Sequence, residues 1–176
     1  GNGQLATRML TAYPAEASCT DLIVHDQTMY ALLDNSGVVT FSLRSANVPM
    51  VVNRQNAASL GIVPHDLVMV GDWPVVIGHG GAVRLTDGKQ IVSTEGNITG
   101  IGMSLDRGIV YATNGQLVDA DTNEILTSAT TIVELDDNAN ADIGTLVYTR
   151  NGVGETEIGL LGGGMRDIKT VTGSVT

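Results

Sequence analysis

The sequence is poor in the residues that usually link or anchor a small domain. It contains one Cys, one Trp and one Phe among 176 residues. A lone thiol, Cys19, excludes an intramolecular disulfide, which fits a cytosolic protein and equally a bacterial envelope protein that needs no covalent link. No run approaches the roughly 18 apolar residues of a membrane-spanning helix. With so few aromatic side chains, the core must be aliphatic.

Basic residues are also scarce. Nine Lys and Arg face 19 Asp and Glu, which gives a net charge of −10. A protein that binds nucleic acid needs a basic stripe to neutralise phosphates, and an anionic membrane surface attracts basic segments. We therefore expect no nucleic-acid partner and no insertion into a membrane, and an anionic membrane surface is disfavoured. The acidity is spread along the chain, as expected for solubility or for affinity for cations or basic partners.

What the sequence does contain favours β-structure. Hydrophobic residues make up 43% of the chain, which excludes disorder by composition. Val and Ile are β-branched and suit a pleated, packed surface, and 22 glycines supply turns. We expect an all-β protein.

A short strand-rich unit recurs about four times. Each copy has an apolar run followed by a glycine turn, and the runs start roughly 35 to 45 residues apart, the period of a four-stranded propeller blade. The four runs are residues 29–33, 74–77, 108–112 and 145–148. An apolar run before each ends near an aspartate suited to a hairpin: Asp26, Asp72, Asp106 and Asp136. Two further short runs follow in each copy.

This pattern predicts a β-propeller-like domain of about four blades, each of four antiparallel strands. The expected blades are residues 21–54, 66–95, 98–130 and 131–172, and the alternative is a β-sandwich. Residues 55–60 are expected to form a longer connection with one helical turn, which Pro64 stops.

The first 20 residues contain a partial copy, since residues 2–5 (NGQL) match residues 114–117. We expect residues 1–20 to be a partial blade or a strand that closes the ring. Alternatively, the chain is part of a larger propeller, and its exposed blade flanks drive self-association.

The third copy carries a family resemblance. Residues 108–126, GIVYATNGQLVDADTNEIL, resemble the repeat of the YVTN and PQQ-like β-propellers: a Val-Tyr strand, a Gly turn, a strand ending in Asp-Ala, and Thr-Asn before the last strand. The resemblance implies the propeller fold. PQQ-like blades close with a Trp after the last strand, and no copy here has it, so the cofactor is not implied.

One stretch suggests calcium. Asp136, Asn138, Asn140 and Asp142 place oxygen side chains at alternate positions, and Ca²⁺ prefers several oxygen ligands around a curled loop. Calcium loops of integrin-type propellers look similar. Ala141 replaces the expected glycine, however, and Gly144 replaces the late acidic ligand. A solvated Asn/Asp-rich turn is the alternative.

The remaining candidate residues suggest partner binding. His25 and His79 are candidates for the mouth of a propeller channel, where ligands usually bind, although the three histidines lack metal-ligand spacing. Trp73, at an expected hairpin corner, is a candidate anchor for a partner; otherwise it packs on the neighbouring blade.

Three functions are compatible with these features. The first is a non-catalytic binding or scaffold module of a larger protein, from the bacterial periplasm, envelope or secretome, that presents loops to a protein, glycan or small ligand. The second is an enzyme, a hydrolase, lyase or oxidoreductase, with its site over the central channel and using His25, His79 and the turn aspartates. The third is a structural element that self-associates through blade flanks. No catalytic residues can be nominated from the sequence.

Overall fold

The computed structural model describes residues 18–44, 49–104, 107–134, 146–151, 156–161 and 169–171. The elements, in chain order, are β1 (Cys19–His25), β2 (Thr28–Leu33), η1 (Asp34–Ser36), β3 (Gly37–Ser42), β4 (Met50–Asn56), α1 (Ala57–Leu60), β5 (Val63–Val70), β6 (Trp73–Arg84), β7 (Lys89–Ser104), β8 (Gly108–Thr113), β9 (Gln116–Asp119), β10 (Ile125–Ser128), β11 (Thr131–Glu134), β12 (Leu146–Asn151), β13 (Thr156–Leu161) and β14 (Lys169–Val171). The expected all-β class is confirmed.

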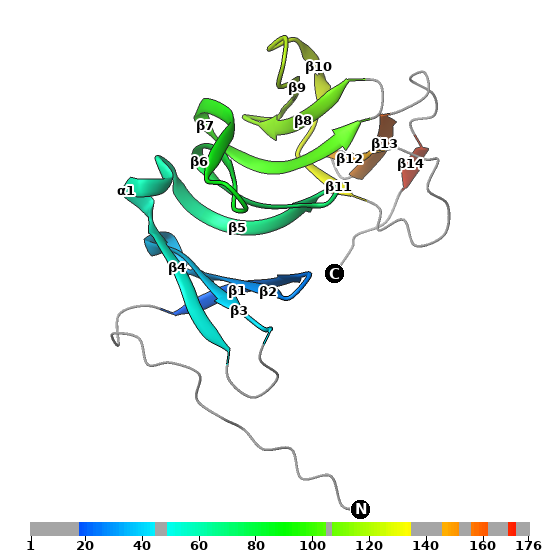
Figure 1. Cartoon of the computed structure of the whole chain (residues 1–176). Coiled ribbons are helices and arrows are strands. Elements are labelled where there is room, and N and C mark those ends of the chain that lie inside the picture. The colour runs from blue at the N-terminus through cyan, green and yellow to red at the C-terminus, as the bar shows by residue number, and fades with distance from the viewer. Residues whose placement is uncertain are drawn as a thin grey trace, which may run out of the picture.

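The strands form three antiparallel sheets. The first has the order β1-β2-β3-β4, the second β10-β9-β8-β7-β6-β5, and the third β11-β12-β13-β14. Figure 1 shows the first sheet at the bottom, the second across the middle and top, and the third at the right. Among the described residues each sheet is open, and the sheets are layered in a sandwich-like arrangement.

Strand β6 doubles back on itself. The main-chain N–H of Leu85 donates to the carbonyl of Pro74 at 2.8 Å. A straight strand of this length would separate those residues by more than 30 Å, at about 3.3 Å per residue. The residues between them must therefore form a hairpin, with its bend at residues 78–81, where the sequence predicts a glycine turn.

Because of this bend, the second sheet consists of two four-stranded parts that share β7. The first arm of β6, residues 73–79, pairs with β5, and the second arm, residues 81–84, pairs with the start of β7. The remainder of β7 pairs with β8, and β8 and β9 continue to β10. One part is thus β5, the two arms of β6 and the start of β7. The other is the end of β7 with β8, β9 and β10.

Aliphatic clusters lie between consecutive four-stranded parts. The first sheet packs on the β5–β6 part through Tyr30, Leu32, Val38, Leu60, Ile62, Leu67, Val76, Val83 and Leu85. The two parts of the second sheet meet through Val70, Val75, Ile77, Ala82, Val92, Ile98, Ile101, Tyr111 and Val118. The β8–β9 part meets the third sheet through Val110, Ala112, Leu117, Ala129, Ile132 and Tyr148. Each of the two parts of the second sheet thus buries one face on either side, and the parts form a continuous stack.

The predicted local features agree with this structure where it describes them. Asp26 and Asp72 lie in the tight turns β1–β2 and β5–β6. A single helical turn, α1, connects the first and second sheets, as the sequence predicts. The helix ends at Leu60, as expected, and its stop is Gly61, whose φ of 71° is left-handed and whose N–H donates to Ala57 O at 3.0 Å. Pro64, expected to prevent a longer helix, lies within β5.

Within the described residues, no helix is long and apolar enough to cross a membrane.

Candidate functional site

A pocket lies where the connection from the first sheet meets the bend of β6. Its first wall is α1, which the sequence positions at both ends. The Asn56 side chain accepts the Ser59 N–H at 2.8 Å, which satisfies a free donor of the first turn. Gly61 closes the other end in the left-handed conformation. The chain then enters β5 directly, so the helix stands beside the start of that strand.

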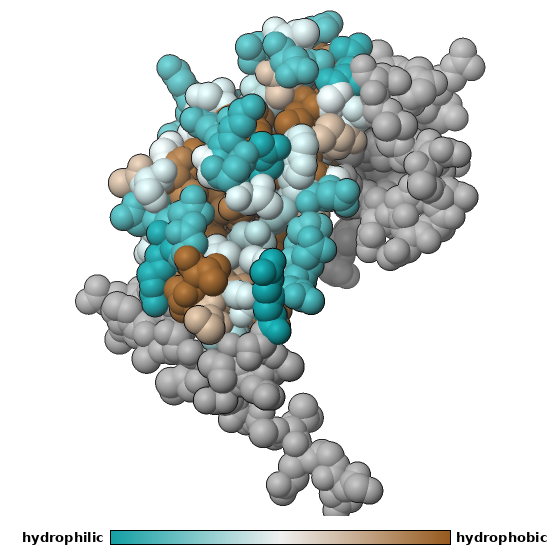
Figure 2. All heavy atoms as spheres, viewed as in Figure 1, coloured by the Kyte–Doolittle hydropathy of each residue, from teal (hydrophilic) through white to brown (hydrophobic). Residues whose placement is uncertain are grey.

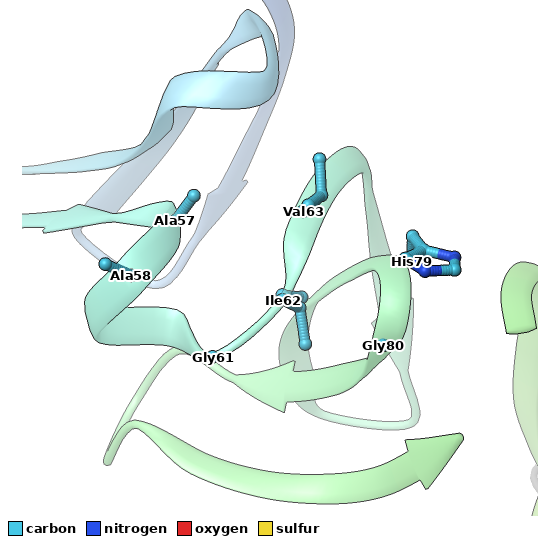
Figure 3. A pocket seen from close by; sticks show the side chains of 7 residues that line it. All are labelled: Ala57, Ala58, Gly61, Ile62, Val63, His79 and Gly80. Carbon is cyan, nitrogen blue, oxygen red and sulfur yellow. The ribbon is translucent and has the colours of Figure 1, made fainter. Parts of the chain in front are cut away.

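The pocket is lined by small and apolar residues. They are Ala57, Ala58, Gly61, Ile62, Val63, His79 and Gly80, and they line a shallow depression of about 390 Å³ that is widely open to solvent. Figure 3 shows the two alanines on α1, Ile62 and Val63 on the chain that leaves it, and the His79 ring beyond Val63 on the bend of β6. This volume is at the lower end of the range for small-ligand sites. A group seated there would contact mainly methyl and methylene surface, with one imidazole at the side.

No protein-family model matches the chain, and no curated protein matches its sequence. The fold and this site therefore carry the functional argument by themselves.

Of the three residues predicted to bind a partner, only His79 lines this pocket. His25 ends β1, and its Nε2 lies 3.5 Å from a carboxylate oxygen of Asp26. That carboxylate belongs to the β1–β2 turn, where Asp26 has a left-handed φ of 52°.

Trp73 packs as a corner residue. It is half-buried against the cluster between the two parts of the second sheet. The Arg84 guanidinium lies 4.6 Å from the centre of the indole, a cation–π distance. Arg84 also holds Asp87 through two hydrogen bonds and lowers the pKa of that carboxyl to about 2. The indole thus contacts Arg84 of its own hairpin, and partner binding by Trp73 stays a prediction.

The candidate calcium residues Asp136, Asn138, Asn140 and Asp142 lie outside the described residues, so calcium binding there stays a prediction. Among the described residues, no group of three or more His, Cys, Asp or Glu comes together to hold a metal.

The acidic turn after β9 is held together by hydrogen bonds to the carboxylate of Asp119. The buried Asp119 carboxylate accepts the N–H groups of Asp121 and Thr122 at 2.9 and 3.0 Å. These hydrogen bonds hold the pKa of Asp119 below its usual range, and the bond from the Thr122 N–H has the largest effect. The Arg107 guanidinium, 3.8 Å away, lowers the pKa further. Asp119 therefore organises the β9–β10 turn.

Sequence reasoning missed a carboxyl pair that joins two sheets. Asp21 of β1 and Asp66 of β5 both accept the Leu67 N–H, at 2.9 and 3.0 Å. Burial, followed by the hydrogen bond and the charge of Asp21, raises the pKa of Asp66, against a small opposing effect of the Leu67 N–H and His65. The two residues are 45 positions apart, so only the packing of the first sheet on β5 brings them together.

This pair predicts a pH-dependent stability. A raised pKa in the folded state means that the stabilisation from Asp66 is complete below the ordinary pKa of aspartic acid and is lost as the pH rises through the raised value. We expect Asp66→Asn, which keeps the shape and can donate to Asp21, to flatten this dependence. At pH 7 the variant should gain about 0.5 kcal/mol, a small value because the Asp66 carboxyl is only partly buried and the residue as a whole stays exposed, so solvent screens the repulsion.

Urea unfolding of both proteins between pH 3 and 8 measures the effect. The matched control is Asp72→Asn, in the exposed β5–β6 turn. Equal pH profiles for Asp66→Asn and the wild type would rule out a shared proton between the two sheets.

Proposed function

We propose that the chain is a non-catalytic binding module whose stacked β-meanders act as blades of a propeller-like array. The support is the packing. An aliphatic cluster lies between each consecutive pair of four-stranded parts, so each of the two parts of the second sheet packs on a neighbour through either face. Such stacking is what propeller blades require, and it yields a rigid platform for loops.

A shared backbone feature supports repetition of the unit. Gly37 and Gly81 each begin the third strand of a four-stranded part, with φ of 145° and 147°. At both, an added Cβ would collide with a carbonyl of the next strand, that of Gln55 or of Val92. Two consecutive parts thus use glycine at the same place for the same steric reason.

We further propose that the pocket beside α1 takes an apolar group of a protein, glycan or small-molecule partner. The observation that carries this proposal is its lining: two alanines, Ile62 and Val63 form an apolar surface on a solvent-open site, and His79 lies at its margin. Burying a few CH₂ groups there would stabilise a complex by about 0.8 kcal/mol for each. Sites of this kind fix orientation through few polar groups.

Titration with a small apolar probe tests whether the pocket binds a ligand. Two-dimensional ¹H–¹⁵N spectra are recorded while 4-phenylbutyrate, an apolar chain with a carboxylate, is added to the protein. We expect the amides of residues 57–63 and 80 to shift and to saturate with a dissociation constant of about 1 mM or weaker, as is typical of a fragment.

Ala58→Trp should abolish these shifts, because the indole would occupy the pocket. Ser59→Trp is the matched control, since Ser59 lies on the same helix and does not line the pocket. If Ala58→Trp bound the probe like the wild type, or if the shifts fell on other residues, the pocket would not be the site.

A further inference from the structure

Side chains link the first strands of successive four-stranded parts. These first strands are β1, β5, the end of β7 and β11, and each contacts the next along the chain. In every case a side chain of one strand bonds a main-chain group of its neighbour. The three links are the Leu67 N–H donating to Asp21 Oδ2 (2.9 Å), His65 Nε2 donating to the Ile98 carbonyl (2.9 Å) and Thr131 Oγ1 donating to the Thr99 carbonyl (2.6 Å).

Each link lies beside a β-bulge. The register of the first strand with the second strand shifts by one residue at Thr20 in β1, at His65 in β5 and at Thr99 in β7. In each part the extra residue lies opposite the end of the second strand. A bulge leaves one residue unpaired and re-aims the side chains around it. Three consecutive parts thus use the same irregularity, at the same place, to reach the next first strand.

Of the three links, the one between β1 and β5 contains a pair of carboxyl groups. Asp66 follows the bulge of β5 as Asp21 follows the bulge of β1, and both carboxyls accept the Leu67 N–H. The residue that follows the bulge of β7 is Gly100, which has no side chain. Two like charges therefore meet at the first joint and not at the equivalent place in β7.

The other two links keep their donors between pH 3 and pH 8. The Nε2–H of His65 donates to a carbonyl whether or not Nδ1 also binds a proton. The hydroxyl of Thr131 does not ionise in this range. A change of pH therefore acts on the link between β1 and β5 and leaves the other two in place.

The Asp66 carboxyl is the group of the first link that responds to pH. Burial raises its pKa most, and Asp21 raises it further through a hydrogen bond and its charge, while the Leu67 N–H and His65 lower it. Among the described residues, Asp21 and His65 are the ionisable groups that act on this carboxyl.

The two sheets also pack through the apolar cluster that contains Leu32, Leu67 and Val76. Figure 2 shows hydrophobic residues between hydrophilic ones through the middle of the described part of the molecule. Packing of this kind carries no charge that a proton could change. A change at the carboxyl pair therefore leaves the two sheets packed on each other.

We propose that a proton operates the link between β1 and β5. With one proton on the pair, one carboxyl donates to the other, and Asp21 holds the Leu67 N–H. When both carboxylates are charged they repel each other, and Asp21 releases that N–H, which Asp66 of the same strand keeps. The joint thus loosens locally as the pH rises through the raised pKa of Asp66. The proposal is independent of the function of the pocket.

Carbon-13 NMR of the side-chain carboxyls tests whether the pair is coupled. In Asp21→Asn the pKa of Asp66 should fall, because the charge and the hydrogen bond of Asp21 are lost, although burial still raises it. Asp72→Asn, in the exposed β5–β6 turn, is the matched control and should leave the pKa of Asp66 unchanged. An Asp66 titration that is the same in Asp21→Asn and in the wild type would overturn the proposal.

The coupling across the hydrogen bond, from the Leu67 amide nitrogen to the Asp21 carboxyl carbon, measures the release itself. We expect this coupling below the measured pKa of Asp66 and its loss above it, whereas in Asp66→Asn it should persist at both pH values. The coupling from the Thr122 amide to the Asp119 carboxyl carbon is the internal reference and should persist throughout. An equal Leu67–Asp21 coupling at both pH values in the wild type, or its loss in Asp66→Asn as well, would contradict operation by a proton.

Discussion

Gly81→Ala is expected to destabilise the protein by about 3 kcal/mol. Gly81 has a φ of 147° where β6 turns back, a conformation that side chains with a Cβ rarely adopt. An added Cβ would also collide with the Val92 carbonyl of the neighbouring strand. A main-chain carbonyl in a ladder cannot move without losing its hydrogen bonds, so strain and collision add. Chemical denaturation monitored by circular dichroism measures the loss.

Gly61→Ala is the matched control. Gly61 also has a positive φ, 71°, but a Cβ there meets nothing within 4 Å. Only the conformational cost remains, and we expect a loss of about 1 kcal/mol. If the two variants lost equal stability, β6 would not make the close approach that forms the second four-stranded part.

The second large effect is expected from Ile98→Ala, a loss of about 3–4 kcal/mol. Ile98 is fully buried in the cluster between the two parts of the second sheet. Truncation removes buried methyl and methylene groups and leaves a cavity that strands on both sides cannot fill. Trp73, the only Trp, packs against the same cluster, so its fluorescence reports on this interface directly.

The control for this variant is Ile125→Ala, at a position 56% exposed, which should change stability by less than about 0.5 kcal/mol. In the Ile98→Ala protein, Trp73 fluorescence and circular dichroism should report one common transition, because the stacked parts share their clusters. Separate transitions would mean that the parts unfold independently.

The sequence was sufficient for the strands and their turns because these depend on local chemistry. Alternating apolar residues and the glycine turn at residues 78–81 predict the β6 hairpin, and Asp26 and Asp72 mark two further turns correctly. The end of α1 at Leu60 was predicted correctly, but the stop was assigned to Pro64 because Gly61, the nearer local stop, was overlooked. The Asn56 and Gly61 pair was the available signal for the helix.

The pocket beside α1 could not be predicted from the sequence. The pocket combines α1 with the bend of β6, about 20 residues later, and neither segment has a chemical motif of its own. Asp21 and Asp66 likewise become a pair only through packing between sheets. The propeller-like arrangement, the calcium stretch at residues 136–142 and the family resemblance remain predictions.

Methyl–methyl nuclear Overhauser effects in a protein labelled at Ile, Leu and Val methyls test the stacked arrangement most directly. The structure predicts contacts within β6 between Val76 and Val83, from Leu32 to the Leu67 and Val76 cluster, and from Val110 to Ile132. Observation of all three sets would establish the β6 hairpin, the packing of the first sheet on the β5–β6 part, and the packing of the β8–β9 part on the third sheet. Absence of the contacts between Leu32 and the second sheet, or of the Val76–Val83 contact, would contradict the account.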